Sequence, residues 1–499
     1  MITREIRGLR VSAAARFDAI AEAYETWGED CVNHLTGDFA FAICDSRRQK
    51  LFCARDHFGV KPFFYAQVSG GLIFSDALVE LREHPEVSDE LNETAIGDYL
   101  LFGVNQDLSS TTFRDIHRLP PAHCLSVSNG SVVVRRYWEP SISNEIRFRD
   151  ERSYVDRFLE LLTEAVRERV GTERVSVLMS GGLDSTSVAA IACEMAEVRA
   201  CTVAYDELIR DEEGRYSTIA REHLGIQGTR INADGYGLFE GVLQQPEPFF
   251  ISVLGGQFKD SLRACADHGR VALTGWDGDA LMNERRQSRF GLRSLLKRLL
   301  PRKPLDQHPA WIDESFAKRT NLHERWQASF HHEPIRKQSA RIRVLNSPMW
   351  PAIFEGYDRS VTKLDLEVCH PFMDLRLVEF LLAIPHAPWC VNKHILREAM
   401  KDRLPAAIIN RPKTPLAGDP ALQLVRRASV RWLDSFEVNP QLERFVNLDR
   451  RRPLADEQTS DGLWANLRVY ALNHWLTNSQ PIVRRNLINN DRAYKTSIA

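Results

Sequence analysis

The sequence predicts an α/β protein of two parts, a strand-rich N-terminal half followed by a C-terminal half built on an open parallel sheet. Short aromatic and β-branched runs, separated by turn residues, fill residues 38–138. Near Glu151 the apolar period changes to that of a helix, and short apolar strands then alternate with helical segments. A chain of 499 residues is long enough for two domains.

In the N-terminal half, four runs have the composition of strands, and the preceding residues 15–30 have that of a helix. The turn residues SRRQ and SGG separate neighbouring strands. The expected strands are FAFAICD (39–45), KLFCARD (50–56), PFFYAQV (62–68) and GLIFSD (71–76).

In the C-terminal half, helices and strands are expected in alternation. Such alternation favours a parallel sheet with helices on both faces, and ligands of these sheets bind beyond the carboxyl ends of the strands. The expected helices are 153–170, 185–198 and 215–225, and the expected strands are 175–180, 201–206 and 271–275.

Composition excludes several classes of function. The net charge of −2 gives no overall field that would attract nucleic acid or an anionic membrane. No stretch approaches the roughly 20 apolar residues that span a bilayer, and the first ten residues lack the apolar centre of a signal peptide. The nine cysteines are scattered without a CxxC pair, which is typical of reduced thiols. We therefore expect a cytoplasmic protein with no membrane span.

A glycine-rich turn lies between the strand 175–180 and the helix that follows it. Glycines let the backbone approach an anion, and the N–H groups at the start of the helix can hold it. Hydroxyls add donors, and an aspartate can carry a metal ion that neutralises phosphate. Any tight strand–helix connection could contain SGG, but the flanking strand, helix and aspartate favour pyrophosphate binding. The residues are Ser180, Gly181, Gly182, Leu183, Asp184 and Ser185.

A second strand, VALTG, ends in glycine and acid at residues 275–279. Alone, this pattern is an ordinary Gly/Asp turn. If it lies beside the first loop, Asp279 becomes a second carboxylate next to Asp184. Mg²⁺ is commonly held by one or two carboxylates plus substrate phosphates, so the pair predicts a magnesium site.

Residues 284–303 are strongly basic, with eight Lys or Arg against Glu284 alone. A solvated surface helix explains this pattern. A cover over an anionic ligand, a partner-docking helix or a membrane-surface helix explains it equally.

With these motifs in place, the chain resembles the asparagine synthetase superfamily. The N-terminal half contains GDFAFAICD, ARDHFGVKPFFY and RLPPAHCLSV, and the C-terminal half contains SGGLDS, TGWDGD, LEVCHPFMDLRLVEF, KHILREAM and RPKTP in the family order. The resemblance implies a degenerate glutaminase-type (Ntn-like) α+β domain over 1–139 and a linker over 140–150. It further implies a parallel-sheet ATP-pyrophosphatase (PP-loop) synthetase domain over 151–480 and a polar tail over 481–499.

Departures from the family pattern suggest a branch. Glutamine-using members carry a cysteine directly after the first methionine, whereas residue 2 here is Ile2, so we expect no glutamine hydrolysis and an amine that belongs to the substrate. Lasso peptide cyclases and β-lactam synthetases both work in this way. The β-lactam synthetases have a tyrosine, paired with a glutamate as base, at the position of Trp276. The segment 284–345 and the run RPKTPLAGDP look like lasso peptide cyclases.

The resemblance also implies residue roles in an ATP-dependent, AMP-forming ligase that makes amide bonds. Asp184 and Asp279 would hold Mg²⁺, residues 180–185 would bind pyrophosphate, and Val203 would line the adenosine pocket together with Ala204 and Tyr205. Gly275 belongs to the second nucleotide-binding turn.

Four later residues are expected at or near this site. Lys413 in RPKTP would stabilise charge on pyrophosphate and then on the oxyanion, or it is a solvated loop lysine. Glu367 would help to deprotonate the attacking amine, or it forms an ion pair with Arg376 or another cation. Lys393 and Arg397 would aid phosphate binding, or they simply begin a helix.

The expected function is that of a lasso peptide cyclase, with ATP and Mg²⁺ as cofactors and a leaderless core peptide as substrate. A leader peptidase and a leader-recognition protein are possible partners, and nucleic acid is not. The alternatives are an ammonia-dependent asparagine synthetase, a β-lactam synthetase-like ligase, and a non-catalytic scaffold. Ala280, where the family usually has an acid, leaves room for the scaffold.

Overall fold

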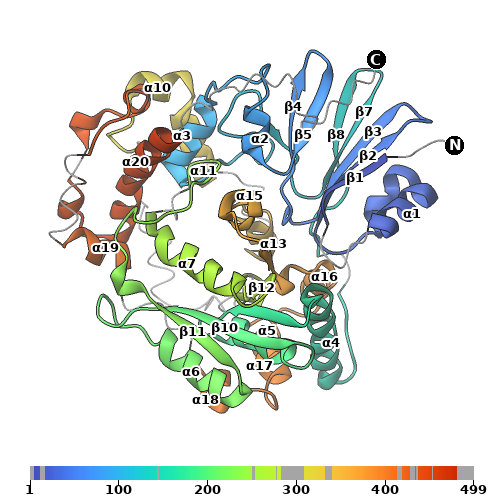
Figure 1. The fold of residues 1–499 in the computed structure, drawn as a ribbon. Helices are drawn as coiled ribbons and strands as arrows, with labels where there is room; N and C mark the ends of the chain where they lie inside the picture. The colour runs from blue at the N-terminus through green and yellow to red at the C-terminus, as the bar shows by residue number, and fades with distance from the viewer. Residues whose placement is uncertain are drawn as a thin grey trace.

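The computed structural model has the predicted two-part α/β architecture (Figure 1). Antiparallel sheets of the N-terminal part lie at the upper right of the figure, and the parallel sheet lies at the bottom. Helices from the second half of the chain fill the left side. The described residues are 5–11, 17–142, 145–249, 253–276, 278–282, 308–331, 340–412, 418–427, 433, 436–451 and 453–479.

The larger N-terminal sheet is antiparallel and has the order β1-β2-β3-β7-β8. Its second strand, β2, alternates large and small side chains: Phe39, Phe41 and Ile43 pack with α1, while Ala40 and Ala42 face the smaller sheet. Both faces of this strand are therefore buried, which explains its apolar sequence. The bounds are β1 Glu5–Val11, β2 Phe39–Asp45, β3 Lys50–Arg55, β7 His123–Ser128, β8 Ser131–Arg136 and α1 Phe17–Trp27.

The smaller N-terminal sheet has the order β5-β4-β6 and packs against α2. The four strands expected in this half and the helix before them are confirmed within a few residues, whereas β1, β6, β7 and β8 were not predicted. The predicted linker, residues 140–150, contains no helix or strand in its described part. The bounds are β4 Phe64–Val68, β5 Gly71–Ser75, β6 His117–Arg118, α2 Leu78–Arg82 and α3 Glu93–Phe102.

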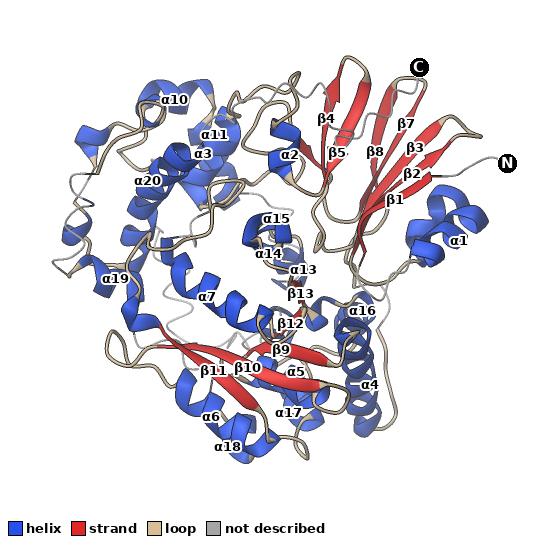
Figure 2. Ribbon diagram, in the orientation of Figure 1, coloured by secondary structure: helices blue, strands red, loops and turns tan. Residues whose placement is uncertain are grey.

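The C-terminal sheet is fully parallel and has the order β11-β10-β9-β12-β13. Helix α7 (Gly255–Ala266) lies on one side of it (Figure 2). On the other side lie α6 (Glu213–Leu224), α17 (His394–Ala399) and α18 (Ala406–Ile409). The chain runs outward from β9 to β11 and then returns to β12, so the strand order reverses between β9 and β12. Ligands bind at such a reversal. The strands are β9 Arg174–Leu178, β10 Glu197–Ala204, β11 Gln227–Asn232, β12 Val271–Thr274 and β13 Glu367–Cys369.

Two predicted boundaries were wrong. The helix expected over 185–198 ends at Ala192, and β10 begins at Glu197 instead of residue 201. A turn over residues 193–196 separates them. Because residues 193–196 contain no glycine or proline, the sequence carries no local signal for this turn.

Helices of the second half connect and cover the two parts. The helices around the parallel sheet are α4 Glu151–Val170, α5 Leu183–Ala192, α6 Glu213–Leu224, α7 Gly255–Ala266 and α8 Gly278–Met282. The later helices are α10 Glu314–Arg319, α11 Leu322–His331, α13 Ala340–Leu345, α14 Met349–Tyr357, α15 Arg359–Thr362, α16 Leu375–Ala383, α17 His394–Ala399, α18 Ala406–Ile409, α19 Pro420–Val425 and α20 Ser460–Asn478.

Helix α3 of the N-terminal part shares a hydrophobic core with α10 and α20. Its Gly97 lies against Leu322, since a Cβ at this glycine would come within 2.5 Å of the leucine Cδ2. The N-terminal part and the later helices of the chain therefore share one packed core on this side of the molecule.

Buried ion pairs also join the two parts. Arg169 on α4 donates to Asp38, with an Nη2–Oδ1 distance of 2.9 Å, and to Asp374, with an Nη1–Oδ2 distance of 2.9 Å. All three side chains are at most 3% exposed. A buried charge is stable only when it is paired, so each part of the molecule supplies charges that the other requires.

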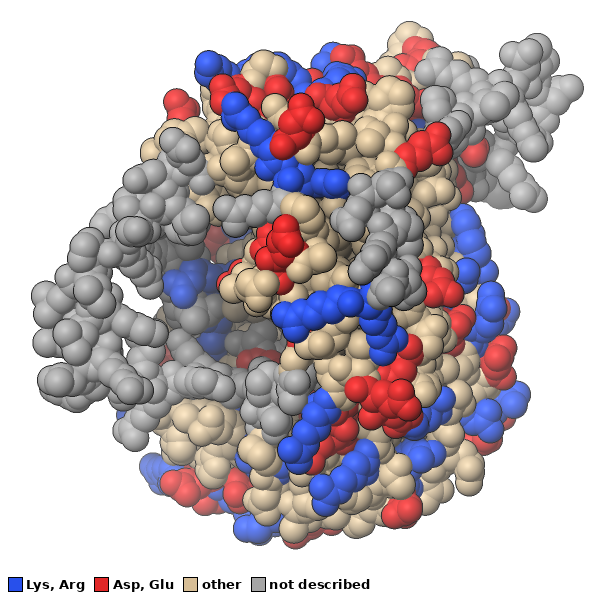
Figure 3. Space-filling view, turned by 90° about the vertical axis from the view of Figure 1, so that its left-hand side faces the viewer, with Lys and Arg blue, Asp and Glu red and all other residues tan. Residues whose placement is uncertain are grey.

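The surface of the described residues agrees with the near-zero net charge. Lys and Arg are interspersed with Asp and Glu over the face shown in Figure 3. Within the described part of the chain, every helix is too short or too polar to cross a bilayer. The basic segment 284–303 and the tail 481–499 lie outside the described residues.

Candidate active site

The glycine-rich turn joins β9 to α5 at the point where the strand order reverses. Gly181 has φ +65°, and a Cβ there would come within 2.5 Å of the Ser217 backbone nitrogen, so only glycine fits. Ser180 N–H donates to Ser185 Oγ at 3.2 Å, and Gly182 N–H donates to Ser180 Oγ at 3.3 Å. The two hydroxyls therefore brace the turn, and the first N–H groups of α5 are left to face an anion.

The loop after β12 lies directly against this turn. A Cβ on Gly275 would come within 2.4 Å of Ser185 N, and one on Gly278 within 2.6 Å of Asp184 Cγ. The two glycines thus permit the close approach of the loops that follow β9 and β12. Asp279, in the first turn of α8, is brought next to Asp184 by this contact.

Asp184 and Asp279 converge on the ammonium group of Lys393. Lys393 Nζ forms ion pairs with Asp184 Oδ2 and, at 2.6 Å, with Asp279 Oδ1. The lysine and Asp184 side chains are 11% and 14% exposed, and Asp279 is 44% exposed. Burial opposes the charge of Lys393, but the two carboxylates together raise its pKa, so it stays cationic.

The backbone of Lys393 is held in an unusual conformation. It has φ 57°, in the left-handed region that residues with a side chain rarely adopt. Its N–H donates to Met282 O at 2.7 Å, at the end of α8. A non-glycine residue in this region is held there by its surroundings, and such positions cluster at functional sites.

The residues present fit a Mg²⁺ ion. Two carboxylates that reach one nitrogen can equally reach one cation, and the start of α5 offers N–H groups for phosphate beside them. No group of three or more His, Cys, Asp or Glu that could hold a metal occurs among the described residues. Asp184 and Asp279 would therefore hold the ion together with phosphate oxygens, and the bound ion would neutralise phosphate charge.

Sequence reasoning assigned no role to Arg411, which the structure places against the same turn. Its guanidinium forms an ion pair with Glu213 at 3.0 Å, donates to Ser180 O at 3.4 Å and lies over the Tyr216 ring, 4.2 Å from its centroid. Burial raises the pKa of Glu213, which Arg411 opposes. Since Arg411 is the first residue of RPKTP, it anchors the segment that leads to Lys413.

Lys413 lies outside the described residues, and its predicted role stays a prediction. Arg397, an expected phosphate ligand, instead donates to the backbone oxygens of Ile409 and, at 3.2 Å, Arg411. It therefore supports the same segment from α17.

The structure does not bring Glu367 to this cluster. Glu367 begins β13 and lies opposite Val271, three residues before the carboxyl end of β12, which is about 10 Å along the strand. Its Oε1 forms an ion pair with Lys61 Nζ at 2.6 Å. The sequence left two interpretations of Glu367, a base for the attacking amine or an ion pair with Arg376 or another cation. The structure shows an ion pair, and the partner is Lys61 of the N-terminal part.

Val203 lies near the carboxyl end of β10, the strand beside β9. It packs with Tyr205 and Ala233, which makes a small apolar patch next to the glycine-rich turn. Its predicted contact with adenosine stays a prediction.

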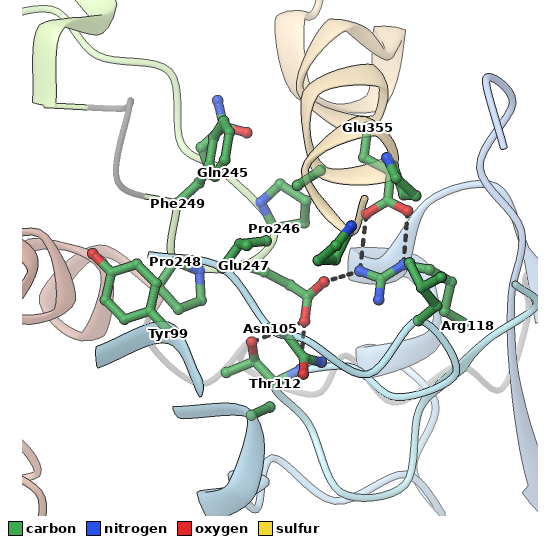
Figure 4. A pocket seen from close by; sticks show the side chains of 16 residues that line it. Tyr99, Asn105, Thr112, Arg118, Gln245, Pro246, Glu247, Pro248, Phe249 and Glu355 are labelled. Carbon is green, nitrogen blue, oxygen red and sulfur yellow. Dashed lines mark hydrogen bonds and ion pairs between the residues drawn. The ribbon is translucent and has the colours of Figure 1, made fainter. Parts of the chain in front are cut away.

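A second pocket lies between the two parts, away from this cluster (Figure 4). Arg118 of the N-terminal part forms ion pairs with Glu247 and with Glu355 on α14. The Nε–Oε1 distance to Glu355 is 2.8 Å. Thr112 Oγ1 donates to Glu247 at 2.8 Å. These partners raise the pKa of Arg118 although burial opposes its charge. Arg118, Thr112, Glu247 and Glu355 thus satisfy one another, and the Arg118–Glu355 contact ties α14 to the N-terminal part.

Comparison with known proteins agrees with this geometry. Residues 3–138 match the glutamine amidotransferase domain family, and residues 157–477 match the asparagine synthase family. Asparagine synthetase 3 (glutamine-hydrolyzing) of Bacillus subtilis strain 168 is 25% identical over 89% of this chain and 77% of its own length. Asparagine synthetase 2 of the same strain is 24% identical over 80% of this chain and 58% of its own length. The amidase chyE of Penicillium rubens is 27% identical over 43% of this chain and 34% of its own length.

An open parallel sheet with an anion-binding turn and two converging carboxylates defines a nucleotide-dependent enzyme of the α/β class. The chain belongs to the asparagine synthase family. The predicted superfamily, the predicted fold class and the predicted enzyme class, an ATP-dependent, AMP-forming ligase that makes amide bonds, are confirmed.

Proposed function

We propose that this protein is a lasso peptide cyclase. A side-chain carboxylate oxygen of an Asp or Glu in a leaderless core peptide attacks the α-phosphorus of ATP, and the bond to the β-phosphate breaks to release pyrophosphate. The N-terminal amine of the same peptide then attacks the acyl carbon, the bond to AMP breaks, and the amine loses a proton. The product is a macrolactam closed by an isopeptide bond.

The convergence of Asp184 and Asp279 beside the start of α5 carries the first half of this proposal. Asp184 and Asp279 would hold Mg²⁺, and the N–H groups at the start of α5 would bind phosphate, at the edge of the sheet where the strand order reverses. Lys393 adds a fixed positive charge as pyrophosphate leaves. The same residues argue against a non-catalytic scaffold, which needs none of these charges.

Trp276 bears on the choice of amine. A tyrosine at this position, as in the β-lactam synthetases that the chain resembles, could take part in proton transfer. The indole has no group that titrates near neutral pH, and its Nε1–H donates to Tyr357 Oη at 2.8 Å. This difference favours a lasso peptide cyclase over a β-lactam synthetase-like enzyme.

An ammonia-dependent asparagine synthetase is the second candidate. It is favoured by the similarity to asparagine synthetase 3 of Bacillus subtilis over 89% of this chain. The two candidates differ in their acid, which is either free aspartate or an aspartyl or glutamyl side chain in a peptide.

ATP–pyrophosphate exchange distinguishes these candidates. With Mg²⁺ and labelled pyrophosphate, we expect exchange that depends on a leaderless peptide with a free N-terminus and an internal Asp or Glu, and a product lighter than the peptide by one water. Exchange with free aspartate, together with ammonia-dependent asparagine formation, would instead identify the second candidate. The lasso proposal also implies a leader peptidase and a leader-recognition protein as partners, which co-purification with the full chain would test.

A further inference from the structure

Trp276 is a large apolar side chain at the edge of the candidate active site. It is 42% exposed and follows Gly275, whose backbone touches the first turn of α5. Gly278, two residues after Trp276, lies against the Asp184 carboxylate. The other large apolar residues exposed in the described structure belong to the first 150 residues: Trp27, Val133, Val134, Ile142 and Phe148.

Trp276 pairs with Trp350 on α14, the helix next to β12 and β13 in Figure 2. The ring centroids are 6.3 Å apart, and the planes meet at 74°. Trp276 donates its indole N–H to Tyr357 Oη at 2.8 Å, and Trp350 donates its own to Val344 O at 2.8 Å. Since both polar groups are satisfied within the protein, the ring carbon atoms remain for a ligand.

The support beneath this pair is buried and neutral. Tyr357 is 7% exposed and packs edge-on against Phe258, with centroids 5.0 Å apart, and burial raises its pKa. Trp276 N–H donates to Thr274 Oγ1 at 3.4 Å, which lies 2.7 Å from His370 Nδ1. Burial lowers the pKa of His370 to about 3, helped by nearby cationic side chains, so the imidazole stays neutral at pH 7.

We propose that Trp276 and Trp350 form an apolar platform that binds the apolar side chain next to the carboxylate being adenylated. The assignment rests on the proposed function and specifies its substrate class as a peptide with an apolar residue beside the reacting Asp or Glu. Free aspartate has only charged groups around its methylene, so contact with this surface would not strengthen its binding. Covering the indole with one leucine side chain strengthens binding about tenfold, at about 25 cal/mol per Å² of apolar surface.

Binding to the full chain tests the platform without turnover. The probes are acetyl-Leu-Asp-Leu-amide and acetyl-Ser-Asp-Ser-amide, titrated calorimetrically with Mg²⁺ and an ATP analogue that cannot be cleaved between the α- and β-phosphates. We expect the leucine probe to bind about tenfold more tightly. Trp276→Ala should remove most of this preference, and Trp276→Phe, which keeps a ring, should retain part of it.

Trp27→Ala is the matched control, because Trp27 is 47% exposed and lies in the N-terminal part. It should leave the preference unchanged. Equal binding of the two probes by the wild-type chain would overturn the platform, as would an unchanged preference in a folded Trp276→Ala variant. Pyrophosphate exchange separates this result from the proposed function. A preference for the leucine probe without exchange would support the platform and contradict the proposed cyclase activity. Exchange without a preference would support the cyclase activity and contradict the platform.

Discussion

Replacing Lys393 by methionine tests the convergence of the two aspartates most directly. The substitution keeps an unbranched side chain and removes the ammonium group. Because Asp184 and Asp279 reach the same nitrogen, their oxygens lie at most about 5 Å apart, and two such charges repel by about 3 kcal/mol at an effective dielectric constant of 20. Asp279 is 44% exposed, so solvent reduces this repulsion to about 1–2 kcal/mol.

This repulsion predicts opposite effects on cation binding and on turnover. In the Lys393→Met variant, a bound divalent ion relieves the repulsion between the two aspartates and is not repelled by an ammonium group. In the absence of nucleotide, this variant should therefore bind Mn²⁺, a paramagnetic substitute for Mg²⁺, about tenfold more tightly than the wild-type chain. Carboxylate-dependent AMP formation should fall about 10²-fold, because a fixed positive charge beside the leaving pyrophosphate is lost. Electron paramagnetic resonance measures free Mn²⁺, and radiolabelled ATP reports AMP.

Lys363→Met is the matched control. Lys363 has φ 58°, close to that of Lys393, but it is exposed at the end of α15. It should change neither Mn²⁺ affinity nor turnover. Unchanged or weaker Mn²⁺ binding by a folded Lys393→Met variant would refute the shared cation site.

Four further outcomes are expected. Asp184→Asn and Asp279→Asn should each abolish AMP formation and leave the circular dichroism spectrum unchanged; near-normal turnover in either variant removes the metal assignment. Lys413→Ala should lower turnover on the order of 10²–10³-fold with little change in ATP affinity, and arginine should rescue poorly; an effect confined to KM for ATP would contradict this. Arg169→Met removes the ion pair of buried Asp38, whereas Asp374 keeps Arg376, so urea unfolding should show a loss of about 3–5 kcal/mol; a loss below 1 kcal/mol would contradict burial of the cluster. His370 has a pKa of about 3 when folded and an ordinary value when unfolded, so its contribution to stability is complete above about pH 6.5 and declines below it by up to about 1.4 kcal/mol per pH unit. His370→Gln should therefore flatten the pH dependence of the free energy of unfolding, measured by urea titration, by this slope.

The glycine-rich turn and the parallel sheet could be predicted because their signals are local. Residues 180–185 carry the strand end, the turn and the helix start in one short run, and the alternation of elements defines the sheet class. The position of Asp279 followed from the same logic, since the carboxyl ends of neighbouring parallel strands meet at one edge. Lys393 lies 209 residues from Asp184, so neither periodicity nor spacing could place its ammonium between the two aspartates.

Register explains why Glu367 lies away from Asp184 and Asp279. A three-residue strand has little apolar pattern to fix its position along its neighbour. The pairing of Glu367 with Val271 sets the carboxylate at the amino end of β13, where Lys61 of the N-terminal part meets it. That partner comes from a distant segment, and the sequence contains no local signal for it.

The N-terminal part has a structural role that does not depend on any chemistry of its own. Its Asp38, Lys61 and Arg118 pair with residues of the C-terminal part that lie on or next to α4, β13 and α14. β13 borders β12, the strand that leads to Asp279, and α14 supports Trp276 through Trp350 and Tyr357. Without the N-terminal part, Arg169, Glu355 and Glu367 would each lose an ion-pair partner, and breaking a buried ion pair costs several kcal/mol. The ligase site therefore depends on the N-terminal part for its geometry, and substitutions at the ion pairs between the two parts should impair the site from a distance.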